Sequence, residues 1–310
     1  MSNNNEYYLK NQLLKISKDS DQAELVALRT GRAQATSGVR DDAIADTLEE
    51  NYSTNDNELE ASWQTHETSM DTASSQITEE LERRSVLLGD LYPFKLDGDI
   101  LSYEQSETLI YEFLLCTSLS PNLTKGKYTG FPRKFERLAT ILTANYLGPN
   151  TRYCHIGFPN EKRRFKNAVM VAVEKSKELH WKPDPELPDE GPRQGDEGVD
   201  YILWKEFGCG RPIGQPFYFG QCACGNDWDT KLGDVSEKFF KWFVKLKVDP
   251  TKFFAVPFVI PDPKLNEVTR EAGIVMDRLR LVKAATTGDH FDSDKWKDKL
   301  FETMQLLVDQ

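Results

Sequence analysis

Two neighbouring stretches of the sequence decide the fold, "EGVDYILWKEF" (197–207) and "PFYFGQCAC" (216–224). Each contains a short run of β-branched and aromatic residues bounded by Gly or Pro, which is typical of a buried β-strand. The connecting "GCGRPIGQ" follows a strand but opens no helix, so we expect it to turn a hairpin and not to bind a dinucleotide. Polar residues crowd the end of the second run, and their purpose is the main question that this sequence raises.

The pattern around these strands predicts an α/β domain. Working from residue 131, we expect helices over 132–148 and 161–181, the two strands, a helix over 236–247, a strand over 253–260, a helix or turn over 262–273, a strand over 274–285 and a last helix over 292–309. This order predicts a domain over residues 122–310 with a mixed central sheet flanked by helices.

Residues 1–121 are expected to form a separate, acidic and mainly helical region. Helices are predicted over 41–52 and 74–91, a hairpin that turns at Asp97-Gly98, and an amphipathic helix over 104–119. Helices with narrow apolar stripes serve partner docking or oligomerisation more often than chemistry. We therefore expect this region to bind a partner protein or a second copy of the chain.

The net charge of −11 is unevenly distributed along the chain. Residues 1–121 hold 9 Lys and Arg against 23 Asp and Glu, whereas residues 122–182 hold 13 against 4. A basic block within an acidic chain predicts a surface that faces phosphate groups. The alternative is a solvated basic face that pairs with the acidic N-terminal region.

The composition indicates a soluble, cytoplasmic protein. The sequence has no run of 18 apolar residues, and its N-terminus lacks the basic and then apolar layout of a signal peptide. Five Cys residues without framework spacing fit reduced thiols.

A possible metal site lies at the ends of the two strands. Asp200 begins an apolar strand, and a carboxylate there must be solvated, paired or bound to a cation. Gln221 lies near the end of the next strand, so it can be a neighbour of Asp200. Carboxylate and amide oxygens suit Mg²⁺ or Mn²⁺, and Lys231 can bring an ammonium group to the same point.

These motifs resemble the PD-(D/E)xK, restriction-endonuclease-like nuclease superfamily. The resemblance covers roughly residues 131–285 and includes the helix "KFERLATILTANYLG" with Glu136, the "GVD" strand and the following strand that ends in Gln. The pattern "FGQCACGNDWDTK" is similar to a subgroup of bacterial defence proteins in which Gln replaces an acidic residue. The resemblance implies a metal-dependent DNA endonuclease with Asp200, Gln221 and Glu136 as metal ligands.

One departure from the family bears on activity. The family has a Lys two residues after the second ligand, where this chain has Ala223. Either Lys231 takes over the orientation of the attacking water, or the site is inactive and the domain is a DNA-binding or assembly scaffold. In both cases the basic block supplies candidate DNA contacts, namely Arg133, Lys134, Arg163, Arg164 and Lys166. The resemblance also implies an antiviral defence role with an ATPase, helicase or sensor as partner.

Other interpretations of the same residues remain open. Cys209, Cys222 and Cys224 lack the paired spacing of a zinc knuckle, and a Cys–His hydrolase would use His155, the one His beside a Cys. Glu136 could be a surface residue that pairs with Arg133 or Lys134. Asp196 competes with Asp200 for the strand position, and Asp227 and Asp229 could cap a helix that follows the strand, with Trp228 packed beneath.

Overall fold

The computed structural model describes residues 2–38, 56–121, 123–157, 171–172, 174–178, 198–233, 235 and 248–309. The chain divides into two compact units, which we call unit 1 (Met1–Leu119 with Met304–Gln310) and unit 2 (Ser120–Thr303). No helix within the described ranges contains a stretch that is long and apolar enough to cross a membrane.

Unit 1 combines long helices with a small antiparallel sheet. Its helices are α1 (Ser2–Thr30), α3 (Asp56–Leu88) and α4 (Ile110–Leu119), with short 3₁₀ segments η1 (Ala35–Gly38) and η2 (Gly89–Leu91). Its strands β1 (Arg32–Gln34), β2 (Phe94–Asp97) and β3 (Ile100–Tyr103) pair in the order β1-β3-β2. The predicted hairpin at residues 97–98 is confirmed, with Gly98 at φ 62°. The helix predicted over 41–52 lies outside the described residues.

Helix α4 differs from the prediction, because it is buried on all sides and not amphipathic. Eight consecutive residues, Ile110–Thr117, are buried, including the carboxylate of Glu112. Glu112 is accommodated because it accepts hydrogen bonds from the Ser106 backbone N–H and hydroxyl, both at 2.7 Å. Burial raises the pKa of Glu112, while these hydrogen bonds oppose the shift.

A fully buried arginine joins α1 to α3. The guanidinium of Arg84 donates to Asp21 at 2.7 Å, to Glu24 at 2.9 Å and to Glu80 at 2.9 Å. Glu24 also accepts from the hydroxyls of Tyr92 and Tyr111, each at 2.7 Å. A buried charge is tolerated only when it is paired and hydrogen-bonded, so these contacts make the packing of the two helices specific.

Replacing Arg84 with Met should destabilise unit 1 by about 3–5 kcal/mol, because buried carboxylates would lose their counter-charge. The matched control is Arg83→Met, since Arg83 also pairs with Glu80, at 2.8 Å, but keeps 29% of its side chain exposed. We expect the control to cost about 1 kcal/mol or less. Urea unfolding followed by circular dichroism measures both changes, and equal shifts in the two variants would contradict the buried-network interpretation.

Unit 2 is built on a mixed sheet, as predicted, and this sheet has five strands. Strands β4 (Thr151–His155), β5 (Tyr201–Lys205), β6 (Phe217–Cys222), β7 (Thr251–Ala255) and β8 (Ile274–Met276) lie in the order β4-β5-β6-β7-β8. The first three are antiparallel, whereas β6–β7 and β7–β8 are parallel. The Gly-rich segment between β5 and β6 connects antiparallel neighbours, so the predicted hairpin is confirmed.

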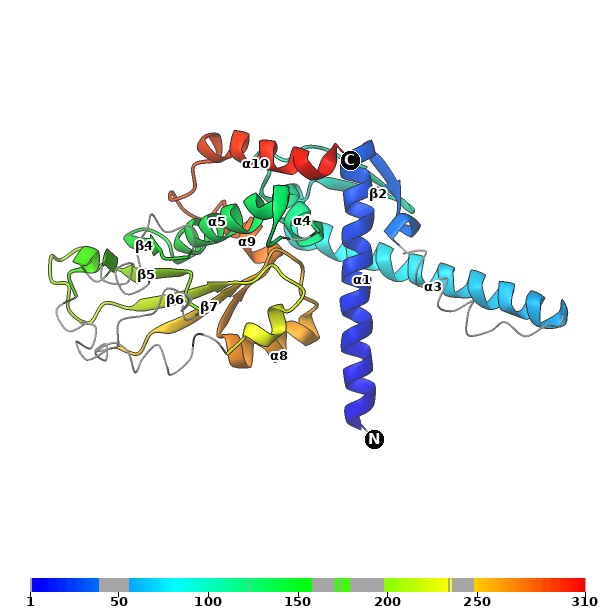
Figure 1. Ribbon diagram of the computed structural model, residues 1–310, viewed down its shortest axis with the longest axis horizontal. Helices are drawn as coiled ribbons and strands as arrows, with labels where there is room; N and C mark the ends of the chain where they lie inside the picture. The colour runs from blue at the N-terminus through cyan, green and yellow to red at the C-terminus, as the bar shows by residue number, and fades with distance from the viewer. Residues whose placement is uncertain are drawn as a thin grey trace. The chain divides into compact units, whose positions relative to one another are not determined.

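Helices cover both faces of this sheet (Figure 1). On one face, Thr143 of α5 (Gly130–Leu147) lies 3.2 Å from the hydroxyl of Tyr201, and Tyr146 contacts the ring of Phe253. On the other face, Val268 and Ala272 of α8 (Asp262–Ala272) belong to the same buried cluster as Phe254. The remaining elements are η3 (Gly126–Thr129), η4 (Trp228–Lys231), α9 (Arg278–Ala284) and α10 (Ser293–Val308), whose last residues belong to unit 1.

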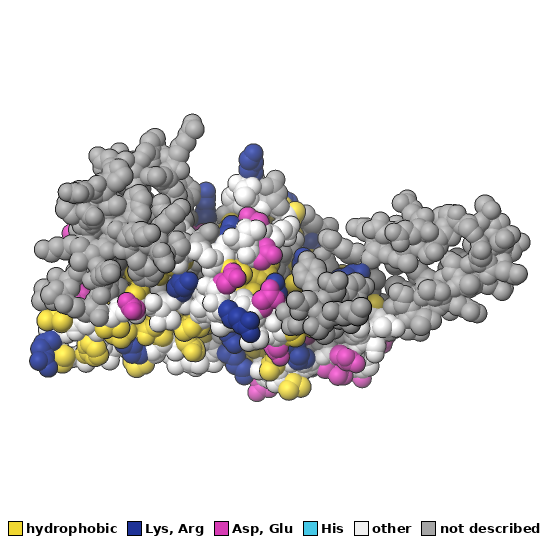
Figure 2. Space-filling view, turned by 90° about the horizontal axis from the view of Figure 1, so that it is seen from below, with side chains coloured by type: hydrophobic (Ala, Val, Ile, Leu, Met, Phe, Trp, Pro, Cys, Tyr) yellow, Lys and Arg dark blue, Asp and Glu magenta, His cyan; other side chains and the backbone are white. Residues whose placement is uncertain are grey.

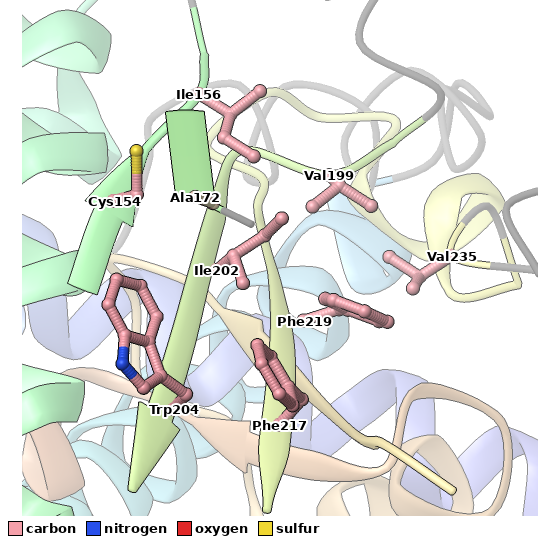
Figure 3. Close-up of a cluster of buried hydrophobic side chains, with 9 residues drawn as sticks. All are labelled: Cys154, Ile156, Ala172, Val199, Ile202, Trp204, Phe217, Phe219 and Val235. Atoms are coloured by element: carbon pink, nitrogen blue, oxygen red, sulfur yellow. The ribbon is translucent and has the colours of Figure 1, made fainter. Parts of the chain in front are cut away.

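A second apolar cluster fills the β5–β6 part of the sheet, and Figure 3 shows its side chains. Ile202 and Trp204 of β5 alternate onto the same face as Phe217 and Phe219 of β6. This is the period of two expected for a strand with a buried face. The cluster also contains Cys154 and Ile156, so the chain at the end of β4 is part of the same core.

The structure differs from the sequence predictions at several strands of unit 2. The strand expected over 253–260 is β7, which covers Thr251–Ala255. The strand expected over 274–285 ends at Met276, because Asp277 caps α9 by accepting a hydrogen bond from the Arg280 backbone N–H at 3.1 Å. Strand β4 was not predicted, since "TRYCH" has the mixed polarity of an exposed sheet edge. The helices expected over 132–148 and 292–309 are confirmed as α5 and α10, whereas the one over 236–247 lies outside the described residues.

Gly220 is needed for space and not for backbone freedom. Its partner across the β5–β6 pair is Tyr201, and a Cβ on Gly220 would lie 1.9 Å from Cζ of the Tyr201 ring. The ring is fully buried and its hydroxyl is held by Thr143, so it cannot move aside easily. Gly220 therefore allows α5 and the sheet to pack around Tyr201.

We expect Gly220→Ala to destabilise unit 2 by about 1–3 kcal/mol or more, because the methyl group overlaps a fixed aromatic ring. Gly233→Ala is the control, since a Cβ there has no heavy atom within 4 Å. Guanidinium unfolding of both variants provides the measurement. An unchanged unfolding midpoint for Gly220→Ala would contradict the packing described here.

Candidate functional site

The candidate site lies where β4, β5 and β6 meet, at the beginning of β5. Asp200 directly precedes β5, and its side chain is well buried, with the residue only 6% exposed. Its backbone N–H donates to Gly220 of β6 at 2.8 Å, and its carbonyl accepts from Ile156 at 2.6 Å and Gly157 at 2.9 Å. Asp200 is thus held by the main chain of both neighbouring segments.

The two carboxylate oxygens of Asp200 have different surroundings. Oδ2 accepts a hydrogen bond from the Cys222 backbone N–H at 2.6 Å. Oδ1 lies 3.1 Å from the position that a Cβ on Gly157 would occupy. Oε2 of Glu136 lies 2.7 Å from the same position, so the two carboxylates approach each other beside Gly157. The structure therefore brings together Glu136 and Asp200, which are 64 residues apart in the chain.

Gln221 is placed by the register of the sheet. Strand β6 pairs with β5 up to Gly220, which lies opposite Tyr201, and Gln221 is the next residue of β6. The Asp200 backbone N–H bonds to the Gly220 carbonyl, so the regular β5–β6 register ends at Tyr201 and Gly220. Gln221 is buried, with 4% of the residue exposed.

Lys231 has a different immediate partner. It ends η4, and its ammonium group lies 3.7 Å from the Asp227 carboxylate. Asp227 precedes η4 but makes no side-chain capping hydrogen bond to it, and the helix expected over 236–247 lies outside the described residues. Trp228 is buried in the cluster around Phe254. Ala223, where the motif resemblance leads us to expect a Lys, is 2% exposed and packs with Trp228 and Phe254 in an apolar cluster.

The charges of the site act on one thiol. Burial raises the pKa of Cys224 to about 12, with the Glu136, Asp200 and Asp227 carboxylates adding to the shift and Lys231 opposing it. Cys224 thus has all of these charged groups in its surroundings. Its thiol is protonated at neutral pH and is a poor nucleophile.

Neither cysteine-based interpretation receives support from the geometry. Cys154 is buried in the apolar cluster and contacts the carbonyl of His155 at 3.8 Å, while the imidazole of His155 lies against Glu136. Cys209 is exposed in the β5–β6 connection. Within the part of the chain that the structure describes, no group of three or more His, Cys, Asp and Glu side chains is arranged to hold a metal ion.

A divalent cation fits the donor chemistry of the remaining set. Two carboxylates and one amide oxygen are hard ligands, and Mg²⁺ commonly binds through one or two carboxylates while water or phosphate completes its shell. A side chain at residue 157 would collide with the Glu136 carboxylate, since its Cβ would lie 2.7 Å from Oε2, so glycine allows the two carboxylates to come this close. Glu136 does not pair with Arg133 or Lys134, the alternative considered from sequence; among the described residues His155 is its hydrogen-bond partner, at 3.3 Å.

The predicted DNA contacts are only partly described. Arg133 is exposed near the start of α5, and burial lowers the pKa of Lys134, with Glu302 opposing that shift and Lys299 and Arg137 adding to it. Arg137 is also exposed on α5, next to Glu136 in the chain. On the face shown in Figure 2, Lys and Arg side chains lie among Asp and Glu side chains. Arg163, Arg164 and Lys166 lie outside the described residues, as does the competing Asp196.

Comparison with protein-family models, with curated proteins and with solved structures finds no match to this chain.

The raised pKa of Cys224 predicts slow alkylation. With a pKa of about 12, roughly one Cys224 thiol in ten thousand is ionised at pH 8, because the thiolate fraction falls tenfold for each pH unit below the pKa. Iodoacetamide at pH 8, followed by peptide mass spectrometry, should label exposed Cys209 well before Cys224. Equal labelling rates would show that the surroundings of Cys224 are not acidic and buried as described.

Proposed function

We propose that unit 2 is a metal-dependent DNA endonuclease that hydrolyses phosphodiester bonds with Mg²⁺ or Mn²⁺. The observation that carries this proposal is the convergence of Glu136 and Asp200 beside Gly157. The two carboxylates come from α5 and from the residue before β5, and their like charges repel each other at short range. A cation bound between them would compensate this repulsion.

The arrangement of secondary structure supports the proposal. The helix with Glu136, the strand that follows Asp200 and the strand with Gln221 occur in the order that the nuclease resemblance requires. The two strands are also antiparallel neighbours within a mixed sheet covered by helices on both faces. A restriction-endonuclease-like fold for unit 2 is part of this proposal.

The proposed roles of the residues follow from their positions. Glu136, Asp200 and Gln221 would hold the cation, and Asp200 is oriented for this by the Cys222 N–H on its other oxygen. A bound divalent cation supplies charge stabilisation at a phosphate oxygen and acidifies a water ligand. Lys231, with 38% of its side chain exposed, can leave Asp227 to orient the attacking water. The basic residues of α5 would bind the DNA backbone, together with Arg163, Arg164 and Lys166.

A second candidate function is a catalytically inactive scaffold that binds DNA or assembles a complex. The observation that favours it is the burial of Ala223 among apolar side chains, where the family has its Lys. The ion pair between Lys231 and Asp227 points in the same direction. Under either function, the resemblance leads us to propose an antiviral defence role, with unit 1 docking an ATPase, helicase or sensor.

Incubation of the purified protein with plasmid DNA in Mg²⁺ or Mn²⁺ tests the nuclease proposal. We expect Asp200→Asn, which keeps an oxygen to accept the Cys222 N–H, to lower the cleavage rate by about 100-fold or more. Mutating a residue that only hydrogen-bonds a metal ligand already lowers metal affinity or activity by about 10–100-fold, and Asp200 would be a ligand itself. Gly157→Ala should have a similar effect, because its methyl group fills the gap between the carboxylates. Lys231→Ala tests the proposed orientation of water.

Gly233→Ala is the control for the glycine substitution and should leave cleavage unchanged. Cleavage that survives both Asp200→Asn and Gly157→Ala would exclude this site as the source of activity. An inactive wild-type protein that still shifts DNA in a gel would favour the scaffold.

A further inference from the structure

His155 is the one described hydrogen-bond partner of the Glu136 carboxylate. Its Nε2 lies 3.3 Å from Oε2 of Glu136. That oxygen is also the one that lies 2.7 Å from the Cβ position of Gly157, facing Asp200. The contact with His155 therefore involves the oxygen that the proposed cation site would use.

The main chain fixes where His155 lies. It is the last residue of β4, and it pairs with Tyr201, which follows Asp200 directly. The next two residues, Ile156 and Gly157, both donate their backbone N–H groups to the Asp200 carbonyl. The His155 imidazole and the Cβ position of Gly157 both lie close to the same Glu136 oxygen, at 3.3 Å and 2.7 Å. His155 and Gly157 are thus neighbours around the Glu136 carboxylate.

The two carboxylates of the site are oriented by different means. Asp200 accepts a backbone N–H on Oδ2, and its Oδ1 lies near the same Gly157 position as Oε2 of Glu136. Glu136 extends from α5, and its backbone carbonyl accepts a hydrogen bond from the Thr140 hydroxyl at 2.7 Å. Its side chain has several rotatable bonds, so without His155 the carboxylate could turn away from the like charge of Asp200.

We propose that His155 is a positioning residue, which donates from Nε2 to Glu136 and keeps its Oε2 directed at Asp200 Oδ1, so that the pair can bind a divalent cation. This inference rests on the proposed metal-dependent function. Outer-shell hydrogen bonds of this kind orient ligating side chains and affect metal affinity strongly. A simple surface pair between His155 and Glu136 would instead leave cation affinity unchanged.

The test is titration of the full chain with Mn²⁺ alone, followed by calorimetry. We expect His155→Ala to raise the Mn²⁺ Kd by about 10–100-fold. His155→Gln, whose amide N–H₂ can take the place of the Nε2–H donor, should recover most of the affinity. His290→Ala is the matched control, because His290 lies beside Tyr153 and contacts Gly148, and it should bind Mn²⁺ as the wild type does.

The outcomes separate this inference from the proposed function. Loss of Mn²⁺ binding in Asp200→Asn with an unchanged Kd in His155→Ala would overturn only the role of His155. No binding of Mn²⁺ by the wild type would overturn both. If circular dichroism shows that His155→Ala is unfolded, the Mn²⁺ Kd of His155→Gln is compared with that of His155→Asn instead. We expect weaker binding by His155→Asn, because the shorter Asn amide cannot reach the Nε2 position. Equal affinities in that pair would contradict the proposal.

Discussion

The candidate site depends on one residue that joins three strands. The backbone of Asp200 bonds to β6 through its N–H and to the end of β4 through its carbonyl, while its side chain accepts the N–H of Cys222. A buried carboxylate must have such partners, since leaving it unpaired costs several kcal/mol. Asp200 therefore supports the sheet as well as the proposed chemistry, which is why an Asn at this position separates the two roles better than an Ala.

Two glycines make this arrangement possible by the space that they leave. Gly220 makes room for the ring of Tyr201, and Gly157 makes room for the carboxylates of Glu136 and Asp200. Neither residue has the positive φ that commonly explains a glycine. In strands, a glycine often marks a close approach by another group, and here each approach comes from a residue distant in sequence.

Unit 1 depends on buried charge to a greater extent than its sequence suggests. Arg84 lies in "ELERRSVLL", which has the composition of an exposed helix face, yet it is fully buried while its neighbour Arg83 is not. Helical periodicity shows which residues share a face but not which face a second helix covers. Only the packing of α1 against α3 places Asp21 and Glu24 within hydrogen-bond distance of the guanidinium.

The sequence by itself determined the hairpin of β5 and β6, the helix α5 and the mixed α/β character of unit 2, because local periodicity and Gly positions encode them. It also singled out Asp200 and Glu136, through a motif resemblance. Tertiary structure alone decided that these two acids face each other beside Gly157, that His155 bonds to one of them and that Lys231 pairs with Asp227. Contacts across a sheet depend on strand register, and a slip of one residue reverses every side chain, so local sequence cannot specify them.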